Sequence, residues 1–187
     1  MICTTLNKIR AHSPCEEGWK KVLAHLGKTK ADDEPLPLLT ILDSNGLDDT
    51  LWCLRTVPEH DREWRLYAVW CARQVQHLMT DPRSIQALDV AERHALRQAT
   101  DEELPAARAA AWAAAWAAEP AACAAACAAA CAAALAAAWA AEPAACAAAC
   151  AAALAAARAA EPAACAAAWD AARAAQEKHL REILEAS

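Results

Sequence analysis

Six cysteines in an alanine-rich segment are the residues of this chain whose type and spacing could do chemistry. They are Cys123, Cys127, Cys131, Cys146, Cys150 and Cys165. Within each run they stand four residues apart, which places them on one face of a helix. Thiolates are soft ligands for Cu(I) and Zn²⁺, so such faces brought together would form a store or sensor for either metal.

Close packing is the second interpretation of the same cysteines. Cysteine is a small apolar side chain that is often buried, and neighbours four apart on one helix have poor geometry for a disulfide. The same stripe also holds Leu135, Trp139, Leu154 and Trp169. Because a metal-binding face would not usually include tryptophan, we favour packing and keep Cu(I) or Zn²⁺ binding as the alternative.

The spacing of the stripe also bears on the shape of the segment. From 108 to 173 a larger residue follows every three alanines or so, and the step shortens to three after each proline. A four-residue step overshoots a helical turn by about 40°, so the stripe drifts around a straight helix. We therefore predict breaks or kinks at the Glu-Pro sites of Pro120, Pro143 and Pro162, in preference to one supercoiled rod.

Composition divides the chain into two regions. Residues 1–105 have mixed globular usage, whereas residues 106–187 are dominated by alanine. Both regions show helical spacing of apolar residues and neither shows the alternation of a strand. The sequence predicts an all-α protein, with an N-terminal helical domain over 1–105 and an alanine-rich helical repeat region over 106–187.

Local signals place several helices. Ser13 is a predicted N-cap with Pro14 in the first helical position and Gly27 at the end. Asp48 is predicted to start a helix, Asp81 is predicted to cap a later one, and Thr100 with Glu103 forms a capping box. A buried stripe is predicted at Trp64, Tyr67, Ala68, Cys71, Val75 and Leu78, and a second at Leu180, Ile183 and Leu184.

Charge and hydropathy argue against nucleic acid and membrane as partners. The net charge is -6 and the alanine-rich region has no basic run, so the electrostatic footprint of nucleic-acid binding is missing. Residues 120–141 are uncharged and long enough to span a bilayer, but they hold a single leucine to favour insertion. The N-terminus shows no secretory signal, and we expect a cytoplasmic protein.

Catalytic motifs are missing from the sequence. It contains no GxGxxG, phosphate-binding Walker loop, GxSxG or CxxC, and its six histidines lack metal-ligand spacing. No nucleophile with a paired base can be identified. We expect that the protein is not an enzyme.

Four stretches carry a resemblance to a known family. They are "LDSNGLDDTLWCLRTV", "DREWRLYAVWCARQVQHL", "DPRSIQALDVAERHA" and "ATDEELPAARAAAWAAAW". In these the chain resembles an all-helical family of bacterial and prophage proteins assigned as immunity proteins of toxin systems, over about residues 1–117 and the last 20. Family members mix Arg, Asp and Trp into an alanine-rich tail, whereas this chain has Cys, Leu and three Glu-Pro insertions.

The resemblance implies a protein that binds a toxin and implies no catalytic residues. Together with the composition, it leads us to expect a non-enzymatic interaction protein whose partner is a toxin or a second copy of itself, in a homo-oligomer. Tryptophan dominates binding hot spots. The expected contacts are Trp112, Trp116, Trp139 and Trp169.

Anaerobic titration with Zn²⁺ or Cu(I) separates the two interpretations of the cysteines. If the thiols serve packing, we expect fewer than about one metal ion bound per four cysteines, with thiols counted before and after addition. Binding at or above that ratio would favour the metal-binding alternative.

Overall fold

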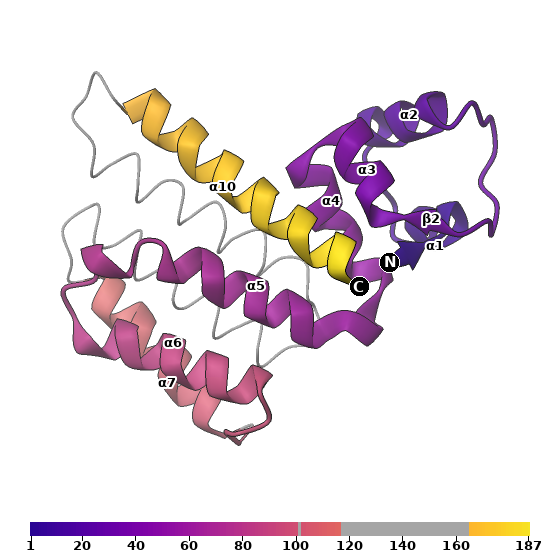
Figure 1. Cartoon of the computed structure of the whole chain (residues 1–187). Helices are drawn as coiled ribbons and strands as arrows, with labels where there is room; N and C mark the ends of the chain where they lie inside the picture. The colour runs from indigo at the N-terminus through magenta and orange to yellow at the C-terminus, as the bar shows by residue number, and fades with distance from the viewer. Residues whose placement is uncertain (101, 117–164) are drawn as a thin grey trace.

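The computed structural model describes residues 1–100, 102–116 and 165–187 (Figure 1). The Glu-Pro sites lie outside these residues, so the predicted breaks or kinks there stay predictions. Helix takes up 73% of the described residues, which confirms the all-α class. The helices are α1 (Leu6–Ala11), α2 (Glu16–His25), α3 (Leu38–Asn45), α4 (Leu47–Cys53), α5 (Asp61–Arg73), α6 (Pro82–Ala95), α7 (Glu103–Trp116) and α10 (Cys165–Ala186), with single 3-10 turns at Leu54–Thr56, Pro58–His60 and Gln76–Leu78.

A small antiparallel sheet was not predicted from the sequence. Strand β1 (Cys3–Thr4) pairs with β2 (Leu36–Pro37), with Cys3 opposite Pro37 and Thr4 opposite Leu36. Two residues per strand are too few for an alternating pattern to be recognised. The pairing holds the N-terminus next to the start of α3.

The start of α2 differs from the prediction, whereas its end agrees. Cys15, not Ser13, is the N-cap: its Sγ accepts the Gly18 backbone N–H at 3.3 Å. Ser13 has a φ of 56° and lies outside the helix. Pro14 therefore precedes the cap at Cys15 instead of taking the first helical position. At the other end Gly27 has a φ of 63°, a conformation that favours glycine, and it closes the helix as predicted.

The predicted capping signals further along the chain are mostly confirmed. The Asp81 side chain accepts the Arg83 N–H at the start of α6. At the start of α7, a Glu103 carboxylate oxygen accepts the Thr100 N–H at 2.9 Å, which is one half of the predicted capping box. Helix α4 begins at Leu47, one residue before the predicted Asp48.

One buried core joins helices from both ends of the chain. Trp64 and Tyr67 of α5 are fully buried, as the predicted stripe requires, and Leu78 is half-buried. Leu180 and Leu184 of α10 are buried in the same core, and Ile183 packs against it. Figure 1 shows α10 running between α5 and the group formed by α1 to α4. How the chain divides into domains stays a prediction.

Helix α10 is also held by polar contacts on both sides. Arg181 forms an ion pair with Asp43 of α3 at 2.7 Å, and Arg173 pairs with Asp48 of α4. On the α5 side, the His179 ring stacks on Trp70 with 4.1 Å between ring centroids. The C-terminal helix, which is far from these helices in the sequence, therefore connects α5 with α3 and α4.

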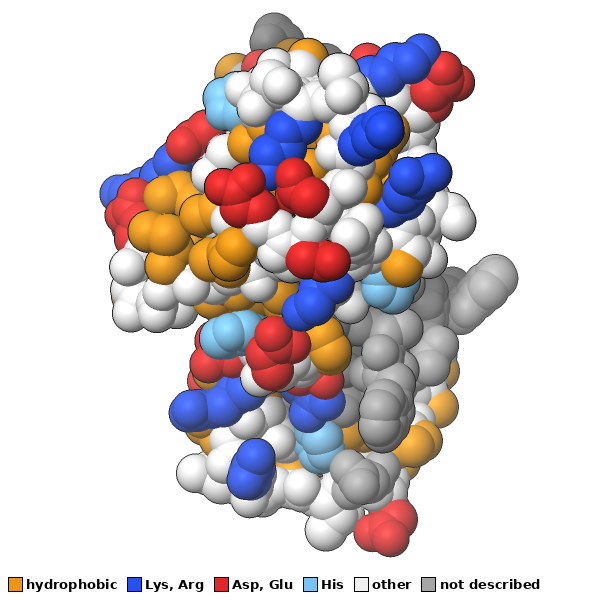
Figure 2. Space-filling model, turned by 90° about the vertical axis from the view of Figure 1, so that its right-hand side faces the viewer, with side chains coloured by type: hydrophobic (Ala, Val, Ile, Leu, Met, Phe, Trp, Pro, Cys, Tyr) orange, Lys and Arg blue, Asp and Glu red, His pale blue; other side chains and the backbone are white. Residues whose placement is uncertain are grey.

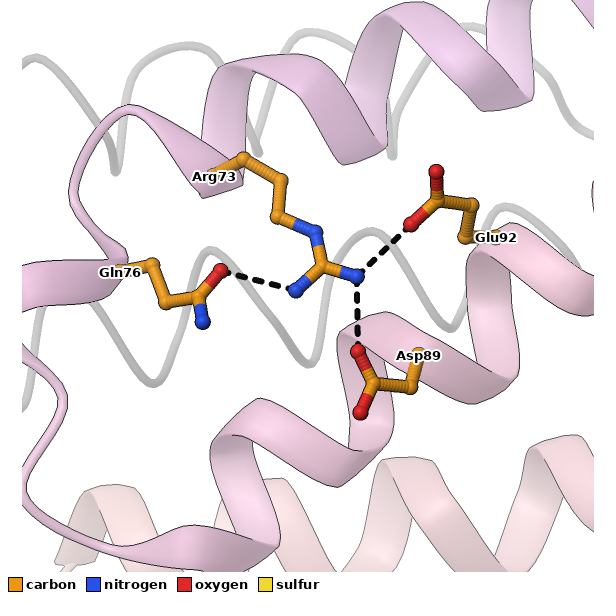
Figure 3. A network of polar contacts seen from close by, with 4 residues as sticks. All are labelled: Arg73, Gln76, Asp89 and Glu92. Carbon is orange, nitrogen blue, oxygen red and sulfur yellow. Dashed lines mark hydrogen bonds and ion pairs between the residues drawn. The ribbon is translucent and has the colours of Figure 1, made fainter.

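A cluster around Arg73 fixes the end of α5 against α6 (Figure 3). One guanidinium nitrogen donates to Asp89 and to Glu92, each at 2.7 Å, and another donates to Gln76 at 2.8 Å. Arg73 is the last residue of α5, and both carboxylates are on α6. We interpret the cluster as a structural clamp.

Truncation of Leu180 tests the role of α10. Because Leu180 is fully buried, we expect Leu180→Ala to lower the free energy of unfolding by about 2–5 kcal/mol, measured by urea denaturation. Lys178→Ala on the exposed side of α10 is the matched control and should change it by less than about 0.5 kcal/mol. A loss below about 1 kcal/mol for Leu180→Ala would contradict the packing described here.

Candidate partner-binding pocket

A hollow of about 80 Å³ lies where α2, α3 and α4 meet. Its walls are mostly apolar, and Cys15 lies at its exposed rim. The residues that line it are Ile9, Pro14, Cys15, Gly18, Trp19, Val22, Ile41, Asn45, Asp49, Trp52 and Cys53. The described residues of the lining therefore all fall between positions 9 and 53.

Gly18 allows α2 to approach α4 closely in the lining of this pocket. A Cβ atom on Gly18 would lie 2.7 Å from Asp49 Oδ2 and 3.2 Å from Cys15 Sγ. Asn45 holds the carboxylate there: its side-chain amide donates to Asp49 Oδ2 at 2.7 Å and to the Gly18 carbonyl at 2.9 Å. A side chain at position 18 would have to displace this hydrogen-bonded carboxylate.

Two tryptophans form the aromatic part of the wall. Trp19 of α2 and Trp52 of α4 are both half-buried, so part of each indole remains accessible. The Arg55 guanidinium lies 4.2 Å from the centroid of the Trp52 ring, and its Nε donates to the Trp52 carbonyl at 3.1 Å. The cation–π contact and the hydrogen bond hold Trp52 at the surface in a fixed orientation.

The buried thiol in the wall is not set up as a nucleophile. Burial, with a smaller contribution from the nearby Asp49 charge and against the opposing effect of Arg55, raises the pKa of Cys53 to about 12. At neutral pH this thiol is protonated, and the thiol form is a poor nucleophile. No histidine is among the lining residues. With an apolar wall, one carboxylate and one amide, the pocket has the features of a recognition site.

The predicted partner-binding tryptophans lie elsewhere or outside the described residues. Trp112 and Trp116 belong to α7, and Trp169 is half-buried on α10. Trp139 lies outside the described part of the chain. Trp169 is not among the described residues that line the pocket, and the role of all four tryptophans in binding stays a prediction.

The predicted metal ligands are mostly beyond the described residues as well. Only Cys165 of the six is included, as the first residue of α10. Among residues 1–100, 102–116 and 165–187, no group of three or more His, Cys, Asp or Glu side chains is placed to hold a metal ion. Metal binding by the alanine-rich segment stays a prediction.

Sequence reasoning missed Trp19 and Trp52 because helical spacing alone does not distinguish a core tryptophan from one at a surface hollow. One signal was available. Gly18 lies inside the predicted helix, where glycine is unfavourable, and an isolated helical glycine often marks a close contact. Its packing partner Asp49 is far away in the sequence and could not be identified from it.

Fold and pocket together define an all-α protein with a small, mostly apolar pocket that two tryptophans help to line. No protein-family model matches the chain, and comparison with curated proteins and with solved structures likewise finds no match. Within the described residues, no helix is both long and apolar enough to cross a bilayer.

Substitution of Gly18 by alanine tests the close contact between Gly18 and Asp49 in the pocket lining. The new methyl group would displace Asp49 and break its hydrogen bond with Asn45, a loss of about 1.5–3 kcal/mol. The better helix propensity of alanine recovers up to about 1 kcal/mol. We expect Gly18→Ala to lower the free energy of unfolding by about 1 kcal/mol.

The matched background for this test is Asp49→Ala, which removes the obstructing carboxylate. In this background Gly18→Ala should leave the free energy of unfolding unchanged or raise it by up to about 1 kcal/mol. If Gly18→Ala changed the free energy of unfolding equally in the two backgrounds, as measured by urea denaturation, the contact with Asp49 would not be what disfavours a side chain at position 18.

Proposed function

We propose that this chain is a non-enzymatic helical interaction protein that binds a protein partner through the pocket between α2, α3 and α4. The observation that supports this most is the pair of half-exposed tryptophans, Trp19 and Trp52, around a preformed hollow. Tryptophan and arginine are enriched in binding hot spots, and hot-spot residues pair with pockets on the partner surface. Trp52 with Arg55 stacked on it has this composition.

The surroundings of the pocket agree with a protein partner. Figure 2 shows the side of the molecule on which α1 and α2 lie, where hydrophobic side chains gather between charged ones of both signs. Interfaces of this kind combine an apolar centre with a polar rim. The hollow is small, so it would receive one side chain of a partner and not a large ligand.

The resemblance to immunity proteins suggests what the partner is. An immunity protein neutralises its toxin by covering a surface that the toxin needs, which requires binding but no chemistry. We propose a toxin as the partner, met in the cytoplasm, with a second copy of this chain as the other candidate. This assignment rests on the resemblance of the four helical stretches and on the pocket.

Truncation of Trp52 tests the proposal. The probes are the full-length protein itself and the products of the two genes that flank its own, each measured by calorimetry and by sedimentation. For a partner that binds at the pocket, we expect Trp52→Ala to weaken the complex at least about tenfold, because hot-spot truncations cost more than about 1.4 kcal/mol.

Two further variants make this result specific. Trp70→Ala removes another half-buried tryptophan, which packs on His179 and does not line the pocket, and should leave binding unchanged. Trp112→Ala with Trp116→Ala tests the site predicted from the sequence. If this double variant loses binding while Trp52→Ala keeps it, the pocket is not the interface.

A further inference from the structure

Among the described residues that line the pocket, Asp49 is the one with a formal charge. Its Oδ2 accepts the Asn45 amide, and no described lysine or arginine forms an ion pair with it. Its carboxylate also lies near the exposed thiol of Cys15, since both are within 3.2 Å of one point beside Gly18. The described lining therefore combines an apolar wall with one partly buried negative charge.

The cations near the pocket are engaged outside its lining. Arg55 lies on the Trp52 ring, Lys21 donates to the Asn45 carbonyl at 3.4 Å, and Arg173 pairs with Asp48. None of the three lines the hollow. The positive charge that would complement Asp49 from inside the pocket is thus not supplied by the described residues.

We infer that the pocket receives a lysine side chain of the partner protein. The slender four-carbon stem would lie along the apolar wall formed by residues such as Val22 and Ile41, and the ammonium group would donate to Asp49. A hollow of about 80 Å³ suits this compact cation better than the broad planar guanidinium of arginine. The Trp19 indole, which helps to line the pocket, would add a favourable cation–π contribution.

This inference rests on the proposed function and specifies the chemistry of the partner. Charge complementarity supports it, because a carboxylate set in an apolar wall disfavours an uncharged apolar side chain and favours a donor. An overall charge of -6 also favours a basic partner surface during encounter.

The probe is n-butylammonium chloride, which reproduces the lysine side chain, and its uncharged counterpart is 1-butanol. Each is titrated into ¹⁵N-labelled full-length protein at constant ionic strength, with the Gly18 amide and the Trp19 and Trp52 indole N–H signals as reporters. Butylammonium should bind weakly, with a Kd on the order of 10 mM, and at least about tenfold more tightly than 1-butanol.

Asp49→Asn keeps the shape of the side chain and removes its charge. It should weaken butylammonium binding about tenfold and leave 1-butanol binding unchanged. The matched control is Asp48→Asn, which makes the same change one residue earlier on α4 but outside the lining, and it should bind butylammonium as the wild type does.

Three results would overturn the inference: equal binding of butylammonium and 1-butanol, an unchanged affinity in Asp49→Asn, or no shift of the reporter signals by butylammonium. The comparison of the two probes uses the wild-type protein, so it stands even if a variant fails to fold. None of these results decides the proposed function, which Trp52→Ala tests separately. If the inference failed and the proposed function held, the pocket would receive an uncharged side chain of the partner.

Discussion

The position of α10 is the constraint on which the rest of this structure depends. Leu180 and Leu184 are buried in the core that α3 and α5 share, and ion pairs from Arg173 and Arg181 reach α4 and α3. Without this helix, buried leucine side chains and the facing surfaces of both helix groups would be open to water, at about 25 cal/mol for each Å² of apolar surface exposed. A segment from the far end of the chain thus completes the core of the N-terminal helices.

Helix α7 shows how alanine can contribute to such a core. Leu104 is fully buried, and Ala107 and Ala111 are buried on the same side of the helix, which packs against α6. A methyl group removes little surface from water, so its value lies in letting two helix backbones come close together. The large side chains of α6, such as Leu88, then fill the remaining space.

The sequence was informative where one residue or a short spacing determines the outcome. The all-α class, the buried face of α5, the Gly27 terminus and the buried side of α10 all follow from helical periodicity or from the conformational freedom of glycine. The N-cap at Cys15 was not predicted, because Ser13 and Pro14 are stronger statistical signals for a helix start. The local preference for a cap at Ser13 was not decisive there, and the helix begins after Cys15, with Gly18 packed against Asp49 of α4.

The pocket could not be predicted for a related reason. The polar part of its lining combines Gly18, Asn45 and Asp49. These residues lie on three helices whose arrangement depends on the core, so no short motif encodes them. The half-exposed positions of Trp19 and Trp52 likewise depend on which faces of α2 and α4 the other helices cover. Tryptophans of the alanine-rich segment were more conspicuous in the sequence because they stand in a uniform background.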